Sequence, residues 1–176
     1  MPYRVVLSAD DISRSLRRIA HEIIEAIPSA QSVLLLGIPT RGIHLAKRLE
    51  QLLISLSPGF EVKRGVLDVT MYRDDLVDAN RVITKTQIPA EGLDKQIVIL
   101  VDDVLFSGRT IRAALDAIVD YGRPAQVKLA VLVDRGHREL PIRPDFIGKN
   151  LPTASQERVS VRVSEVDSLD EVVIES

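Results

Sequence analysis

The chain has 176 residues, enough for one domain with a sizeable core, and 45% of them are hydrophobic while 27% are charged. It contains no cysteine, which excludes disulfides, thiolate catalysis and cysteine-based metal sites. The net charge of −2 means that any nucleic-acid binding must come from a local basic patch, and the lack of a long apolar stretch leads us to expect a cytoplasmic protein with no membrane partner.

The first predicted helix follows Ser8, which forms an N-capping arrangement with Asp11 three residues later. Its apolar face consists of Ile12, Leu16, Ile19, Ile23 and Ile27. Next come a buried strand at 32–38, an amphipathic helix at 43–54 and a strand at 62–72.

The second half of the chain begins with a polar segment without periodicity at 74–86, interpreted as a mobile loop, and a connection at 87–95. Apolar strands are predicted at 97–101 and 127–133, with a helix between them, and 134–153 is irregular. The predicted closing strands are 159–166 and 171–174. Strands that alternate with helices indicate an α/β fold with a parallel sheet.

The most informative segment is the strand that runs into Asp102 and Asp103, followed by a small-residue turn at 107–108 and a helix. The apolar face predicted for that helix is Ile111, Ala114, Leu115 and Ile118. Free backbone N–H groups at the start of the helix can hold a phosphate. Two carboxylates would repel that phosphate, so they require sugar hydroxyls or a hydrated Mg²⁺ as partners. The pattern therefore predicts a ligand that is both a sugar and a phosphate.

Residues 101–110 (Val-Asp-Asp-Val-Leu-Phe-Ser-Gly-Arg-Thr) resemble the phosphoribosyl diphosphate (PRPP) motif of type I phosphoribosyltransferases. Four further segments, 37–42, 68–75, 132–143 and 145–153, fit one subfamily. Together they resemble the PyrR family, bifunctional regulators of pyrimidine operons with uracil phosphoribosyltransferase activity. The resemblance runs from about Asp10 to the C-terminus.

The resemblance implies a type I phosphoribosyltransferase fold in a single domain, 1–176, with a central parallel sheet flanked by helices, a small hood at about 134–158 and a flexible loop at about 72–86. The implied reaction converts uracil and PRPP into UMP and pyrophosphate. Mg²⁺ enters as Mg-PRPP, held mainly by PRPP's own oxygens. The family is typically dimeric or larger, so a homo-oligomer is expected.

The resemblance also implies the site residues. Asp102 and Asp103 would take the ribose hydroxyls, and Arg73 would approach the pyrophosphate when the loop closes. The implied PRPP site comprises Thr40, Arg41, Gly42, Tyr72, Arg73, Asp102, Asp103, Val104, Leu105, Phe106, Ser107, Gly108, Arg109 and Thr110. A nucleotide-triphosphatase loop is excluded at 37–44, because Ile43-His44 replaces the required Lys-Ser/Thr.

The implied base-binding residues are Asp134, Phe146 and Ile147, although Phe146 would also be unremarkable as a core residue. Purine-salvage relatives carry a Lys where this chain has Asp134, and a carboxylate accepts hydrogen bonds whereas a Lys donates them. Phe106 stands where those relatives place an acid near the base. Both differences argue against a purine, and no general base for uracil N1 is assigned.

An RNA-contacting surface is implied at Arg18, His21, His137, Arg138 and Arg143, which would bind pyrimidine operon leader RNA under the control of UMP. A basic stripe on a helix is also typical of a plain solvated face. The alternative function is a phosphoribosyltransferase for uracil or another base without an RNA role. It is motivated by Arg17 and Pro39, which differ from residues found in regulatory members.

Overall fold

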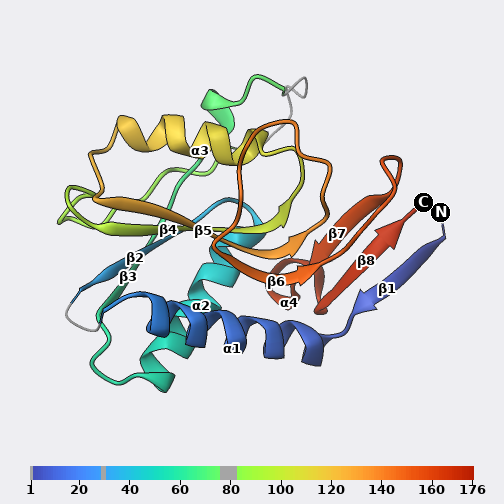
Figure 1. Ribbon diagram of the computed structural model, residues 1–176, viewed down its shortest axis with the longest axis horizontal. Coiled ribbons are helices and arrows are strands. Elements are labelled where there is room, and N and C mark those ends of the chain that lie inside the picture. The colour runs from blue at the N-terminus through green and yellow to red at the C-terminus, as the bar shows by residue number, and fades with distance from the viewer. Residues whose placement is uncertain (1, 29–30, 76–82) are drawn as a thin grey trace.

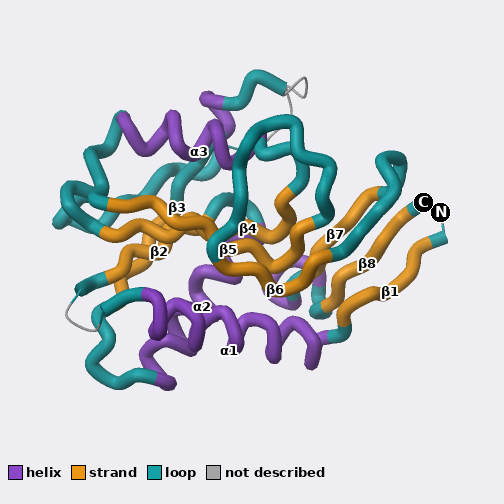
Figure 2. The backbone as a smooth tube through the Cα atoms, in the orientation of Figure 1, coloured by secondary structure: helices purple, strands orange, loops and turns teal. Residues whose placement is uncertain are grey.

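The computed structural model describes residues 2–28, 31–75 and 83–176. Its centre is a five-stranded parallel sheet in the order β3-β2-β4-β5-β6 (Figures 1 and 2). The strands, in chain order, are β2 Val33–Gly37, β3 Val62–Val66, β4 Ile97–Leu105, β5 Gln126–Asp134 and β6 Phe146–Asn150. The predicted α/β fold with a parallel sheet is confirmed.

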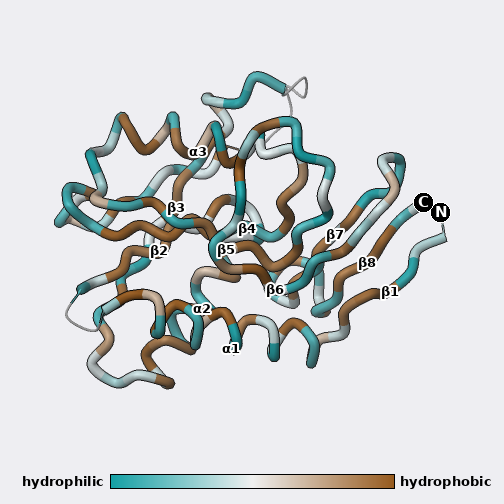
Figure 3. The backbone as a smooth tube through the Cα atoms, in the orientation of Figure 1, coloured by the Kyte–Doolittle hydropathy of each residue, from teal (hydrophilic) through white to brown (hydrophobic). Residues whose placement is uncertain are grey.

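Helices cover both faces of this sheet (Figure 1). The helices α1 (Ala9–Ala26) and α2 (Arg41–Leu56) lie on one face, and α3 (Arg109–Val119) lies on the other. Each face encloses its own apolar core, and the brown stretches of the central strands in Figure 3 run between the two. Two-sided burial explains why the central strands are continuous apolar runs.

The predicted start and apolar face of α1 are confirmed. The Ser8 side chain accepts a hydrogen bond from the Asp11 backbone N–H at 3.2 Å, and the Asp11 carboxylate accepts one from the Ser8 N–H at 2.9 Å. All five predicted apolar positions, from Ile12 to Ile27, are buried. Among the described residues, none of the helices has the length and the apolar run that crossing a bilayer requires.

A second, antiparallel sheet has the order β1-β8-β7, formed by Tyr3–Leu7, Glu171–Glu175 and Arg158–Arg162. The last two strands were predicted, but β1 was not. The chain ends lie side by side in Figure 1 because Tyr3 pairs with Glu175. A short helix, α4 (Ser164–Asp167), connects β7 to β8.

Several predicted boundaries were wrong for local reasons. The strand predicted at 62–72 ends at Val66, because the Asp68 carboxylate accepts the backbone N–H groups of Thr70 and Thr84 and turns the chain into a 3₁₀ helix, Thr70–Tyr72. In α3, Leu115 is 41% exposed, and alanines complete the buried face instead.

The segment predicted as irregular, 134–153, contains β6, the edge strand of the main sheet. Its sequence shows no clear period because Gly148 interrupts it, and a Cβ there would lie 2.4 Å from the Leu132 carbonyl oxygen. The segment predicted as a small hood, about 134–158, thus includes a strand of the main sheet.

Candidate active site

The two adjacent acids lie inside β4, which continues to Leu105 and does not end before them as predicted. Asp102 is buried, and its carboxylate accepts the Asp103 backbone N–H at 2.9 Å. The Asp103 carboxylate accepts the Val104 N–H at 2.8 Å. Local hydrogen bonds thus fix both carboxylates at the carboxyl end of the sheet, where ligands of open α/β folds bind.

Burial raises the pKa of Asp102 well above its ordinary value, and the neighbouring Asp103 carboxylate adds to this effect. The folded protein therefore holds a proton on Asp102 at pH values where the unfolded chain, with a carboxyl pKa of about 3.9, has lost it. Because the native state then binds more protons than the unfolded state, Asp102 reduces stability as the pH rises from about 4 toward its raised folded pKa.

Substitution Asp102→Asn is expected to raise the melting temperature of the ligand-free protein, with little gain at pH 4 and a growing gain toward pH 7. A gain of about 1 kcal/mol corresponds to about 2–4 °C for a chain of this size. Thermal unfolding of both proteins across that pH range tests this. The control Asp116→Asn changes an exposed acid of α3 and should show no such trend. A gain that does not vary with pH would contradict the argument.

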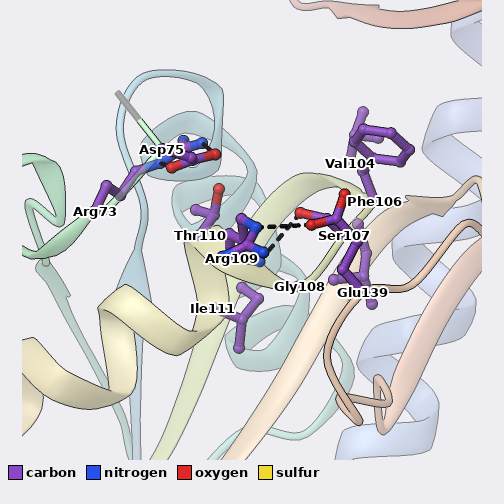
Figure 4. A pocket seen from close by; sticks show the side chains of 11 residues that line it. Arg73, Asp75, Val104, Phe106, Ser107, Gly108, Arg109, Thr110, Ile111 and Glu139 are labelled. Atoms are coloured by element: carbon purple, nitrogen blue, oxygen red, sulfur yellow. Dashed lines mark hydrogen bonds and ion pairs between the residues drawn. The ribbon is translucent and has the colours of Figure 1, made fainter. Parts of the chain in front are cut away.

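The turn between β4 and α3 closes through backbone contacts. Gly108 has φ +96°, a left-handed conformation that glycine adopts without strain, and it directly precedes the first residue of α3, Arg109. The Ser107 carbonyl accepts the N–H groups of Glu139 and Leu140 at 2.9 and 3.1 Å. The N-terminus of α3 thus faces a cavity of about 240 Å³ at the turn (Figure 4).

Charged side chains surround this first cavity. Arg109 donates to the Glu139 carboxylate at 2.8 Å, as Figure 4 shows, and it also pairs with Asp74 at 3.3 Å. Arg73 lies across the cavity, bound to Asp75 by two hydrogen bonds of 2.7 and 2.9 Å. Both arginines therefore have carboxylate partners at the place where a phosphate is predicted to bind.

A second cavity, of about 420 Å³, adjoins the first, because Arg73, Val104 and Thr110 line both. The carboxyl ends of β2 and β4 form it, and it is lined by Ile38, Pro39, Thr40, Arg41, Asp68, Val69, Thr70, Arg73, Asp102, Asp103, Val104 and Thr110. The peptide bond between Pro39 and Thr40 is cis. The fold brings the two predicted phosphate segments together, with the acid pair beside both.

Most of the implied PRPP residues line one of these cavities, and the two exceptions are Gly42 and Tyr72. Gly42 packs beneath, against the Val101 carbonyl. Leu105 also lines the first cavity but is almost completely buried. Tyr72 lines neither cavity, because its hydroxyl donates to Asp120, directly after α3, and this hydrogen bond raises the pKa of Tyr72 to about 12. Residues 76–82 of the predicted flexible loop lie outside the described residues.

The implied base-binding residues do not form one surface. Phe146 is only 4% exposed and packs in the core on the α1 side, so its ring offers no face to a base and the base-binding role implied for it was wrong. Ile147 packs against the opposite core. Asp134 lies at the end of β5, where its carboxylate accepts from Arg138 at 2.5 Å and from the Gly136 N–H at 3.0 Å.

The aromatic ring that borders the first cavity is Phe106, which is 41% exposed. The Arg135 guanidinium lies over it, 4.2 Å from the ring centroid, and His137 meets it edge to face at 6.3 Å. The sequence placed Phe106 in the PRPP run but did not predict this platform. The sequence could have indicated that Phe106 and Arg135 lie close together, because each directly follows the carboxyl end of one of two adjacent strands.

The implied RNA residues divide into two groups. Arg18 donates to the Ile147 and Gly148 carbonyl oxygens at 3.0 and 2.5 Å, which holds α1 against β6. Arg138 donates to the Phe106 and Ile142 carbonyls, both at 2.9 Å, as well as to Asp134. These two arginines therefore have structural partners.

The side chains of the second group, His21, His137 and Arg143, are exposed. Nε2 of His137 lies 2.6 Å from the Thr153 carbonyl oxygen.

A parallel sheet with two adjoining cavities and an acid pair at the carboxyl ends of its strands is the arrangement expected of a phosphoribosyl transferase. A family model described as "Phosphoribosyl transferase domain" matches residues 6–163. Solved hypoxanthine phosphoribosyltransferases share the fold. That of Staphylococcus aureus superposes with a TM-score of 0.74 at 16% identity, covering 96% of this chain and 89% of that one. That of Trypanosoma cruzi gives 0.74 at 17% identity, covering 98% and 91%.

Sequence relatives define the group more narrowly. The "Bifunctional protein PyrR" of Streptomyces coelicolor is 57% identical over 172 residues, 97% of this chain and 89% of the relative. That of Deinococcus radiodurans is 56% identical over 171 residues, 96% and 92% of the two chains. The chain belongs to the PyrR family of phosphoribosyl transferases.

Proposed function

We propose that this protein is a cytoplasmic uracil phosphoribosyltransferase that also binds pyrimidine operon leader RNA in response to UMP and so attenuates transcription. The observation that carries the enzymatic part is the pair of adjoining cavities beside Asp102 and Asp103. One substrate with a phosphate at each end of a ribose accounts for both cavities and for the acids between them. The relatives' name, "Bifunctional protein PyrR", supports the second role.

In this proposal each part of the site binds one part of PRPP. The N–H groups and hydroxyls of the turn 107–110 hold the 5′-phosphate, aided by the N-terminal dipole of α3. The carboxylates of Asp102 and Asp103 accept hydrogen bonds from the ribose hydroxyls. Thr40 and Arg41 bind the pyrophosphate at the start of α2.

The reaction breaks the bond from C1′ of the ribose to pyrophosphate and forms a bond from C1′ to uracil N1, which loses its proton. Positioning of the two substrates contributes up to about 7–11 kcal/mol, and arginines at the pyrophosphate stabilise the charge on the leaving group. In this proposal Mg²⁺ enters as Mg-PRPP, held mainly by PRPP's own oxygens. Mg²⁺ bound in this way supplies charge neutralisation on the pyrophosphate.

The base is proposed to lie near the Phe106 ring and Asp134. Arg138 and the Gly136 N–H lower the pKa of Asp134 below its ordinary value, although burial acts in the opposite direction. Asp134 is thus an acceptor, which suits a ring N–H of uracil and not the oxo group of a purine. Phe106 supplies an aromatic face where purine relatives have an acid.

The decisive enzymatic experiment is a radiolabelled uracil assay with PRPP and Mg²⁺, in competition with hypoxanthine and guanine. We expect UMP to form and the purines not to compete. Absence of UMP at saturating substrates would refute the uracil assignment, and strong competition would indicate a purine enzyme.

The RNA role predicts that loss of an exposed arginine on the proposed RNA surface weakens RNA binding, whereas loss of an exposed arginine elsewhere does not. Arg143→Ala is expected to weaken UMP-dependent binding of the leader RNA and to reduce the slope of log affinity against log salt by about 0.7, because it removes one phosphate contact. Gel shifts at several salt concentrations measure this. The matched control, Arg123→Ala, removes an exposed cation from a distant turn and should change neither quantity.

A second candidate is a transferase without an RNA role, favoured by the structural partners of Arg18 and Arg138. It predicts RNA affinity that neither UMP nor loss of Arg143 changes.

The proposed regulator is a homodimer or larger assembly, in which a twofold axis joins two basic faces into one surface. Light scattering of the purified protein measures the assembly.

A further inference from the structure

Arg41, at the start of α2, has a carboxylate partner from a distant part of the chain. Its Nε and Nη2 donate to the two carboxylate oxygens of Asp167 in α4, at 3.0 and 2.7 Å. The same arginine lines the 420 Å³ cavity together with Thr40, Asp102 and Asp103. One charged group therefore joins α4 to the proposed pyrophosphate site.

Asp167 is itself held in place. Its carboxylate accepts the Val163 backbone N–H at 2.9 Å, and its own N–H donates to the Val163 carbonyl at 2.7 Å. Arg48, two turns further along α2, binds the same segment through Glu165 and Asp170 at 2.5 and 2.8 Å. The Asp167 carboxylate is thus a fixed support for Arg41.

A guanidinium can bind a second anion while Asp167 holds it. A guanidinium is planar and carries five N–H donors, and Asp167 takes two of them on the edge formed by Nε and Nη2. The edge that includes Nη1 remains for a second anion in the same plane. A phosphate binds most strongly to such a fork when its orientation is already set, since no rotamer entropy is then lost.

We propose that Asp167 is a positioning residue for pyrophosphate: it holds Arg41 by one edge, so that the edge that includes Nη1 is presented to the leaving group. This inference rests on the proposed function, because it assigns a residue to the pyrophosphate half of that site. The negative charge of Asp167 also opposes an incoming anion. Since Arg41 and Asp167 are both partly exposed, solvent screens that repulsion, and the orienting effect is the larger one.

The test compares Asp167→Ala with Glu165→Gln, which removes a partner of Arg48 from the same short helix but leaves Arg41 paired. Titration calorimetry with Mg-pyrophosphate and, separately, with UMP is carried out on each full-length protein. We expect Asp167→Ala to bind pyrophosphate about tenfold more weakly, the loss of about one charge-assisted hydrogen bond, and to bind UMP as the parent protein does. Glu165→Gln should bind both ligands normally, and Asp167→Glu should restore part of the affinity.

Unchanged or tighter pyrophosphate binding by Asp167→Ala would overturn the proposal, and so would an equal loss for UMP, which would indicate a general disturbance of the fold. A parent protein that binds pyrophosphate but makes no UMP would overturn the proposed enzymatic function and leave the role of Asp167 standing. In steady-state assays the same variant should raise the KM for PRPP and leave the KM for uracil unchanged.

Discussion

The double substitution Asp102→Asn/Asp103→Asn is expected to reduce the rate of UMP formation by about 10²–10⁴-fold. The physical reason is the loss of carboxylate acceptors: above the raised pKa of Asp102, each hydrogen bond from a ribose hydroxyl to a carboxylate is worth about 1.5–3 kcal/mol, and a neutral amide recovers only part of that. The fold should survive, because an Asn oxygen can still accept the backbone N–H groups that Asp102 and Asp103 accept now.

Two measurements separate chemistry from folding in this experiment. Circular dichroism and thermal unfolding should show a folded variant, whereas a thermal-shift titration should show loss of stabilisation by PRPP. Asp116→Asn, an exposed acid of α3, should keep full activity. A double variant that retains more than about a tenth of the parent rate would mean that the acid pair does not carry the ribose contacts.

Prediction from sequence succeeded where one physical signal dominated. The strand before Asp102 is covered on both faces, so its apolar run is unbroken, and the capping box at Ser8 is complete within four residues. It failed where a strand depends on distant partners. The edge strand β6 has Gly148 at a contact with Leu132, and β1 is stabilised by pairing with β8 at the other end of the chain.

In the candidate site, too, local patterns were predicted from the sequence and contacts between distant segments were not. The phosphate segments were found because each is a strand followed by a helix, a local pattern. The two segments adjoin because β2 and β4 are neighbours in the sheet, and no local sequence pattern encodes that pairing. The burial of Phe146 and the partners of Arg18, Arg41 and Arg138 depend on tertiary packing, so only the structure reveals them.

The second large effect is expected from Gly42→Ala, at the point where the proposed pyrophosphate segment touches β4. A Cβ on Gly42 would lie 2.4 Å from the Val101 carbonyl oxygen, closer than any real contact, and Val101 directly precedes Asp102. The carbonyl belongs to a central strand and cannot yield, so the start of α2 must move away from the acids. Overpacking of this kind costs about 1–3 kcal/mol of stability. A displacement of about 1 Å in a reacting site can cost about 10²-fold in rate.

The comparison that isolates this effect is Gly59→Ala. Gly59 has φ +93°, and nothing lies within 4 Å of the position that an added methyl group would take, so its substitution costs about 1–2 kcal/mol of backbone strain without touching the site. Both variants should therefore lose similar stability in thermal unfolding, but only Gly42→Ala should lose transferase activity and pyrophosphate affinity. Equal activity in the two variants would show that the proposed pyrophosphate segment works independently of its contact with β4. A loss of activity and pyrophosphate affinity in Gly42→Ala alone would show that the close approach of α2 to β4 is required to join the proposed pyrophosphate segment and the acid pair in one site.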